Sequence, residues 1–148
     1  MNHLLRNVLA VIAGLVAACV VNMSIIHCGS FVVSPPPGAD MNTVEGIRAA
    51  MPQMTPIHFL TPLLAHALGT LAGGLAAAVT AASHKMTLAL VIGVIFLGMG
   101  IAMVSMVGGP VWFIVCDLGL AYVPMAWLGA KISTAVTGRN ARENNQRP

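Results

Sequence analysis

The chain has 148 residues, of which 57% are hydrophobic and only 7% are charged. Soluble domains carry about a quarter charged residues, so this composition excludes an ordinary water-soluble globule. A mean hydropathy of +0.87 instead predicts one polytopic membrane domain, because so much apolar surface needs the lipid bilayer as its solvent. The net charge of +3 gives no reason to expect a nucleic-acid partner.

Four stretches that carry at most one charged residue predict four transmembrane helices. The first covers residues 8–27 and the second residues 57–83. The next uncharged run is longer than the roughly 20 residues of one span, so Gly108-Gly109-Pro110 is expected to divide it into spans at 86–107 and 111–130. These lengths disfavour a β-barrel. The predicted fold is therefore all-α, a four-transmembrane-helix bundle in a single domain over residues 1–138.

Positive charges predict the orientation of this bundle. Only Arg48 falls in the loop of residues 28–56, whereas six of the seven lysines and arginines fall on the other side of a four-span topology, namely Arg6, Lys85, Lys131, Arg139, Arg142 and Arg147. Cytoplasmic loops are enriched in these residues, so both termini are predicted to be cytoplasmic and the loop to face outward. Residues 139–148 form a polar cytoplasmic tail, which is expected to be disordered.

The outer loop of residues 28–56 is predicted to contain a short helix. Pro35-Pro36-Pro37-Gly38 is expected to form a stiff turn, and either Asp40 or Asn42 is expected to cap the helix, with Glu45 three residues after Asn42 as in a capping box. An apolar face recurs at helical spacing through Met41, Val44, Ile47 and Met51. This face would lie on the mouth of the bundle or in the lipid interface, either as a lid or as an ordinary surface helix.

Small residues repeat every four positions within the predicted spans and indicate where helix backbones approach closely. The candidate packing glycines are Gly14 in the first span, Gly69 and Gly73 in the second, and Gly98 in the third. Ala126 and Ala130 are the corresponding residues of the fourth span. Whether one of these stripes serves a homo-oligomer stays open.

Each span also places one polar side chain at a similar depth in the outer half of the membrane. These residues are Asn22, His66, Ser105 and Asp117. Asp117 is the sharpest signal, because a carboxylate in a span must pair, be hydrated or be protonated. His66 is its expected partner by depth, and His58, Glu45 and His27 are expected to extend the line outward.

This arrangement predicts an outward-facing intramembrane polar cavity that binds or translocates a proton, a cation or a small polar solute. Its predicted site residues are Asp117, His66, His58, Asn22, Ser105 and Glu45. A competing interpretation is that the polar residues only bond the helices together, as in a non-catalytic accessory or scaffold subunit of a larger membrane complex.

A third interpretation is a metal-dependent membrane enzyme. His58, His66 and Asp117 are weak candidate metal ligands, because two histidines eight residues apart do not share one helix face. Ten methionines would suit copper(I), but methionine usually fills space in apolar helices. No cofactor is predicted, and the absence of nucleophile-elbow and phosphate-loop motifs argues against an enzyme.

Segments spread over nearly the whole chain resemble those of a known group of proteins. They include Val21-Asn22-Met23, Pro36-Pro37-Gly38-Ala39-Asp40, Ala65-His66-Ala67-Leu68-Gly69-Thr70-Leu71, Trp112-Phe113, Asp117-Leu118 and Ala121-Tyr122-Val123-Pro124-Met125-Ala126-Trp127-Leu128-Gly129. In these segments the chain resembles a family of small four-span bacterial integral membrane proteins with no assigned activity. The resemblance implies the four-helix fold and a multi-pass location in the bacterial inner (plasma) membrane, and it implies no chemistry.

Overall fold

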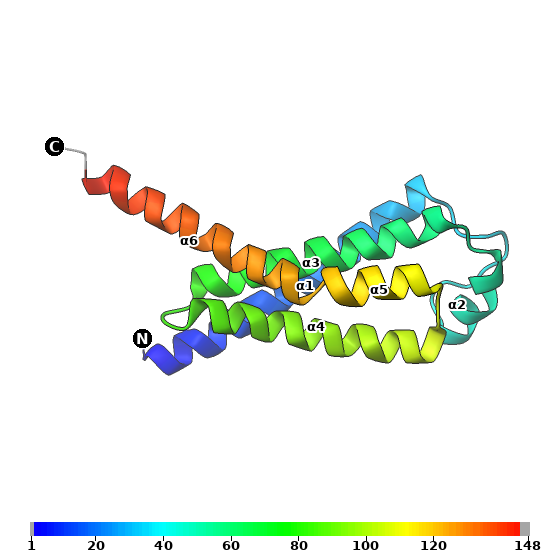
Figure 1. The fold of residues 1–148 in the computed structure, drawn as a ribbon, viewed down its shortest axis with the longest axis horizontal. Coiled ribbons are helices and arrows are strands. Elements are labelled where there is room, and N and C mark those ends of the chain that lie inside the picture. Colours follow the sequence, from blue (N-terminus) through cyan, green and yellow to red (C-terminus); the bar gives the residue numbers. More distant parts are fainter. Residues whose placement is uncertain (1, 146–148) are drawn as a thin grey trace.

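The structure is a computed structural model that describes the backbone of residues 2–145 and the side chains of residues 2–136. Its elements in chain order are α1 (His3–Val32), α2 (Val44–Ala50), η1 (Met51–Gln53), η2 (Pro56–Phe59), α3 (Leu60–Thr80), α4 (Lys85–Val107), α5 (Val111–Leu120) and α6 (Val123–Asn145), and the described chain contains no strand (Figure 1). Four segments are long and apolar enough to cross a membrane. The predicted all-α fold with four candidate spans is confirmed.

The helix boundaries follow the predicted spans, with shifts at several ends: α1 begins at His3, five residues before its predicted span, and α3 ends at Thr80, three residues before the predicted end. α4 begins one residue before the predicted third span, and the predicted break after it is present, since Gly108 and Gly109 have φ angles of +82° and +150° that favour glycine. α1 continues to Val32, five residues past its predicted end, because nothing before Pro35 forbids a helix. α6 continues to Asn145, so the expected disorder of the tail is not found there, and residues 146–148 lie outside the described part.

The predicted fourth span is divided into two helices. α5 ends at Leu120, residues 121–122 form a turn, and α6 begins at Val123. Pro124 explains the break, because it has no N–H to donate to the carbonyl of Leu120 and its ring crowds that carbonyl. The α5–α6 segment therefore changes direction inside the candidate span (Figure 1).

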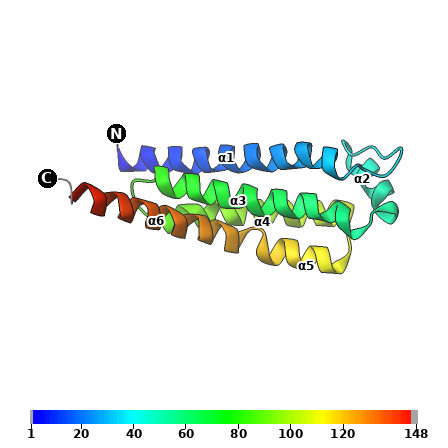
Figure 2. The ribbon, with the colours of Figure 1, turned by 90° about the horizontal axis from the view of Figure 1, so that it is seen from above.

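α3 lies in the centre of the bundle. It packs against α1 on one side and α6 on the other, and α4 contacts both α3 and α6 (Figure 2). The start of α1 and the end of α6 lie at one end of the bundle, and the loop segment with α2 lies at the other (Figure 1). We call these the terminal end and the loop end.

Close backbone contact at α3 depends on missing side chains. A Cβ on Gly73 would lie 2.7 Å from both the Ala18 Cβ and the Gly14 carbonyl oxygen, and a Cβ on Gly69 would lie 3.0 Å from the Ala18 carbonyl oxygen. Gly14, Gly69 and Gly73 therefore lie where α1 and α3 approach each other closely.

The packing role predicted for Gly98 is wrong within this chain. Gly98 is exposed, and a Cβ there would meet no atom within 4 Å. Gly93 and Gly100 are the buried glycines of α4 instead. Because α4 is apolar on every face, its sequence pattern does not reveal which side packs inward.

The terminal end is held by polar side chains of α1. Asn7 Nδ2 donates to Ser83 Oγ at 3.0 Å, and Asn7 Oδ1 accepts from the backbone N–H groups of Ala82 and Ser83. Arg6 Nε donates to the carbonyl of Thr80 at 2.8 Å. These bonds satisfy backbone groups left free where α3 ends, and they leave no free polar group of Asn7 to form part of a site.

Candidate functional site

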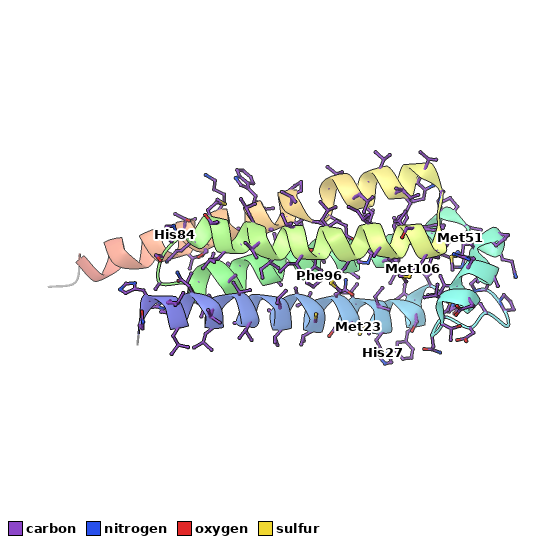
Figure 3. The ribbon with its side chains drawn as sticks, turned by 90° about the horizontal axis from the view of Figure 1, so that it is seen from below. Met23, His27, Met51, His84, Phe96 and Met106 are labelled. Atoms are coloured by element: carbon purple, nitrogen blue, oxygen red, sulfur yellow. The ribbon has the colours of Figure 1, made fainter. Side chains whose placement is uncertain are left out.

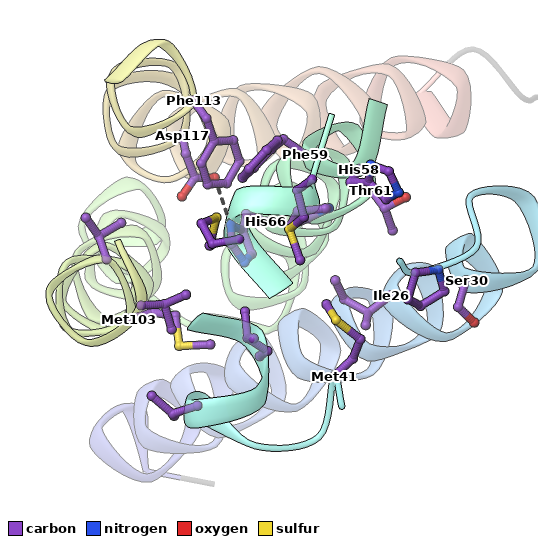
Figure 4. Close-up of a pocket in the computed structure, with 18 of the residues that line it drawn as sticks. Ile26, Ser30, Met41, His58, Phe59, Thr61, His66, Met103, Phe113 and Asp117 are labelled. Atoms are coloured by element: carbon purple, nitrogen blue, oxygen red, sulfur yellow. Dashed lines mark hydrogen bonds and ion pairs between the residues drawn. The ribbon is translucent and has the colours of Figure 1, made fainter. Parts of the chain in front are cut away.

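A cavity of about 530 Å³ lies at the loop end of the bundle, between the helices and the segment that contains α2, η1 and η2 (Figure 4). Its wall is mostly apolar and includes five methionines, namely Met23, Met41, Met51, Met54 and Met103. The titratable groups that line it are His58, His66 and Asp117. The size and the few polar groups in an apolar wall are typical of a small-molecule site.

Three side chains form a hydrogen-bonded group, which we call the polar cluster, and two of them, His66 and Asp117, line the cavity. His66 of α3 places Nδ1 2.7 Å from Asp117 Oδ1 of α5. Tyr122, in the turn after α5, donates its hydroxyl to Asp117 Oδ2 at 2.9 Å, and its oxygen lies 3.0 Å from His66 Nδ1. The predicted contact between His66 and Asp117 is present, and both carboxylate oxygens are satisfied.

Burial differs within the polar cluster. Asp117 and Tyr122 are each 1% exposed, whereas a quarter of the His66 side chain is accessible. Because Asp117 is an acceptor when ionised, the bond at 2.7 Å places a proton on His66 Nδ1. His66 lines the cavity, and its second ring nitrogen, Nε2, forms no hydrogen bond with any described residue.

Aromatic rings separate the buried carboxylate of Asp117 from water. Phe59 and Phe113 both line the cavity, are nearly buried, and have ring centroids 5.0 Å apart. Trp112 packs edge-on against Phe59 at 5.8 Å. In Figure 4, Phe113 and Phe59 lie beside Asp117 on one side of the cavity. A low-dielectric wall of this kind strengthens interactions with Asp117.

Between the polar cluster and the terminal end, the bundle is tightly packed. Ala18, Ile92 and Phe96 are buried and pack in one apolar core with Tyr122 (Figure 3 shows Phe96 inside the bundle). Thr70, one turn beyond His66, is fully buried and donates its hydroxyl to the His66 carbonyl at 2.7 Å. The cavity is thus a pocket at the loop end rather than a passage to the terminal end.

Two other predicted site residues also line the cavity without joining the polar cluster. Asn22 of α1 is half-buried there, and its side chain forms no hydrogen bond with the described residues. His58 is half-buried in η2, and its Nδ1 accepts from the backbone N–H of Thr55 at 3.0 Å, as in a capping box. His58 does not contact His66, so the expected line of contacts is interrupted.

The remaining predicted residues lie outside the cavity. Ser105 is exposed and donates to the Ala102 carbonyl of its own helix at 2.7 Å. Glu45 is exposed in the first turn of α2. His27 points away from the bundle and packs against Phe31 at 5.5 Å (Figure 3). Depth alone therefore misplaced Ser105, because a helical residue also needs the correct rotation about the helix axis to face the site.

The loop helix is present but is capped differently from the prediction. Thr43, rather than Asp40 or Asn42, is the N-cap of α2, and its hydroxyl accepts from the Gly46 N–H. Asp40 accepts from the Asn42 N–H and the Thr43 hydroxyl, which lowers the pKa of its carboxyl group. Arg48 connects α2 to the bundle by donating to the Met106 carbonyl near the end of α4.

Sequence reasoning missed Tyr122 and the Phe59–Phe113 wall. Residues five apart lie about 140° apart around a continuous helix, so Tyr122 would not face Asp117 without the break after Leu120. The available signal was that the single tyrosine of the chain stands inside a span, two residues before a proline.

Within the described residues, no three side chains of His, Cys, Asp or Glu come together as a group that could hold a metal ion. The weak candidate ligands His58, His66 and Asp117 therefore do not form a metal-ligand set among the described residues. No protein-family model, curated protein or solved structure matches the chain.

Proposed function

We propose that this four-span membrane protein binds a small molecule in the loop-end cavity, with the polar cluster as the recognition point. The single observation that carries the proposal is the geometry of His66. Its Nδ1 is held by buried Asp117 at 2.7 Å, while the same side chain lines the cavity and is a quarter accessible. A carboxylate that orients an imidazole in this way leaves Nε2 to accept or donate a proton.

The competing interpretation, that the polar cluster only bonds helices together, accounts for part of this geometry. The bonds between α3 and α5 would serve that purpose. Helix bonding alone gives no reason for a cavity of about 530 Å³ beside the cluster, or for a histidine edge without a partner in the described chain. Away from bulk water, a ring nitrogen without a partner leaves one hydrogen bond unmade, which is costly.

Binding is better supported than passage through this conformation. The core beyond the polar cluster is so tightly packed that a Cβ on Gly14 would lie 2.9 Å from the Ala77 Cβ. Translocation of a proton, cation or solute would need a second conformation in which this contact opens.

The side of the membrane from which the cavity opens is part of the proposal. Arg6, Lys85 and Lys131 belong to the terminal end, whereas Arg48 belongs to the loop end. This charge distribution supports cytoplasmic termini and a cavity that faces outward, in the bacterial inner membrane that the sequence resemblance implies.

Labelling of engineered cysteines tests the cavity and its orientation. The three native cysteines are first replaced by alanine. Met103→Cys then places a thiol on the cavity wall, and Ile101→Cys places one on the outer face of the same helix, where Ile101 is 52% exposed. A membrane-impermeant maleimide applied to the outer side should label Met103→Cys and leave Ile101→Cys unlabelled, because lipid-facing thiols do not ionise. Equal labelling, or labelling of Met103→Cys only from the cytoplasmic side, would overturn the proposal.

Two variants of Asp117 separate recognition from helix bonding. Asp117→Asn keeps an acceptor for His66 Nδ1–H and a donor for the Tyr122 oxygen, so we expect it to assemble as a monodisperse protein. Asp117→Ala leaves both partners unsatisfied and should unfold at a lower temperature. If both variants fail to assemble to the same extent, helix bonding explains the cluster. Size-exclusion chromatography and thermal unfolding in detergent provide the measurements.

A further inference from the structure

We infer that the ligand of the cavity is a lipophilic organic monocation, and that its binding releases one proton from the polar cluster. This inference rests on the proposed function, since it names the ligand class of the same cavity. It starts from an imbalance of charge, because Asp117 is an acid that the protein buries without a lysine or arginine beside it.

The described chain supplies no permanent positive charge to the cavity. Its lining includes no lysine or arginine, and the guanidinium of Arg48 is directed to the Met106 carbonyl. The titratable groups that face Asp117 are His66 from α3 and Tyr122 from the α5–α6 turn. His58 of η2 lines the cavity farther along, and α1, α2 and α4 contribute no titratable group to its lining.

The polar cluster therefore has two charge states. With one extra proton, which belongs to the coupled cluster rather than to one atom, an imidazolium and a carboxylate give a net charge of zero. Without that proton, a neutral His66 beside ionised Asp117 gives a net charge of −1. An uncompensated charge in an apolar site is costly, so the proton leaves readily only when another cation takes its place.

Exchange of this kind conserves charge and atoms. The protonated cluster and a free cation become the deprotonated cluster with a bound cation, and one proton passes from His66 Nε2 to water. No covalent bond between protein and ligand forms, and no group is oxidised or reduced. The net charge of the cavity is zero before and after binding.

The walls of the cavity suit a cation that carries apolar groups. Phe59 and Phe113 contribute aromatic rings to the lining, and aromatic rings attract cations. The five methionines offer flexible, polarisable surface. A small hydrated metal cation would lose its water shell in such a wall, where Asp117 is the only carboxylate among the lining residues. Quaternary phosphonium and ammonium ions, and protonated amines with apolar substituents, fit both the charge and the wall.

A pair of ions with the same shape and opposite charge tests this inference. Isothermal titration of the purified protein in detergent with tetraphenylphosphonium should show saturable binding, whereas tetraphenylborate should show none. Repeating the titration at one pH in phosphate and in Tris, whose ionisation heats differ, counts the protons released. We expect up to one proton per bound cation, and therefore an affinity that rises with pH by up to about tenfold per pH unit.

A matched pair of variants locates the effect. Asp117→Asn should abolish both the binding of tetraphenylphosphonium and the proton release, whereas Glu45→Gln removes the same charge from the exposed helix α2, outside the cavity, and should change neither. His58→Gln should retain proton release if the proton comes from the polar cluster. Binding of both ions with equal affinity, or cation binding without proton release or pH dependence in the wild-type protein, would overturn the inference, and these wild-type measurements do not depend on the folding of any variant.

The outcome can be separated from that of the proposed function. If Met103→Cys is labelled from outside but tetraphenylphosphonium does not bind, the proposed cavity is supported and its assignment to lipophilic cations is wrong. If Met103→Cys is not labelled, the proposed function is wrong as well.

Discussion

Gly100→Ala is a small change that should disturb the polar cluster without replacing any of its side chains. A Cβ on Gly100 would lie 2.5 Å from the Tyr122 oxygen, 2.7 Å from Cζ and 2.9 Å from Cε2. Ordinary contacts of a Cβ lie at 3.4–4 Å, so the phenol ring would have to withdraw by about 1 Å. Tyr122 is 1% exposed and packs against Phe96 and Ile92, which leaves little space for that movement.

Three terms set the expected loss of stability. Overpacking of a dense core costs about 1–3 kcal/mol. Weakening the bond from Tyr122 to the Asp117 carboxylate, now 2.9 Å long, costs about 1.5–3 kcal/mol. The better helix propensity of alanine returns about 1 kcal/mol. The free energy of unfolding should therefore fall by about 1.5–5 kcal/mol, with the larger part at the polar cluster.

Gly98→Ala is the matched control on the same helix. It makes the same chemical change two residues away, at an exposed position where a Cβ meets no atom within 4 Å. It should leave the free energy of unfolding unchanged or raise it by up to about 1 kcal/mol. Reversible unfolding in mixed micelles with increasing SDS measures both variants. If Gly100→Ala is as stable as Gly98→Ala, the close contact between α4 and Tyr122 does not support the cluster and this reasoning is wrong.

Three further predictions concern the two ends of the bundle. Asn7→Ala removes three hydrogen bonds to Ala82 and Ser83 and should lower the free energy of unfolding by about 1–3 kcal/mol in the same SDS assay; an unchanged midpoint would show that water replaces these bonds at no cost. His84→Gly should raise the thermal unfolding temperature, because His84 is exposed, forms no side-chain cap and has a left-handed φ of +52° that costs a non-glycine residue about 1 kcal/mol; a lower temperature would contradict this. The lowered pKa of Asp40 means that its carboxylate stabilises the loop turn above the ordinary aspartate pKa of 3.8, and that this contribution is lost as the pH falls through the lowered value. The amide resonance of Asn42 should follow that titration, and a resonance that does not move below pH 4 would count against the bond.

The positions of the candidate spans were predictable because the length and low charge that a membrane-crossing helix needs can be read from the sequence. A crossing helix needs about 20 residues with almost no charge, and a break such as Gly108-Gly109-Pro110 consists of residue types that few other structures require. The contact between His66 and Asp117 was predictable for the same reason, since a buried carboxylate needs a partner and only one titratable side chain within a span lay at a similar depth.

Rotation of each helix about its axis was less predictable. Ser105 and Gly98 were predicted to lie on the inner face of α4, but both are exposed. The prediction was wrong because all faces of this helix are nearly equally apolar, so no pattern in the sequence identifies the face that packs inward. α1 and α3 were assigned correctly, since Gly14 and Gly73 stand where a Cβ would clash with the neighbouring backbone. A small residue is thus informative only when the opposite face of the same helix carries large ones.

Tyr122 shows how a break in the backbone contributes a residue to the site. In a continuous helix Tyr122 and Asp117 would point about 140° apart, so no periodicity relates them. Pro124 ends α5 at Leu120, and the turn that follows lets the hydroxyl of Tyr122 reach a carboxylate five residues earlier, at 2.9 Å. One short segment then supplies both the buried acid and a donor for it, while α3 supplies only His66. The acid is therefore held by two bonds of which one is local, so movement of α3 could change the partner of Asp117 without exposing both of its oxygens at once.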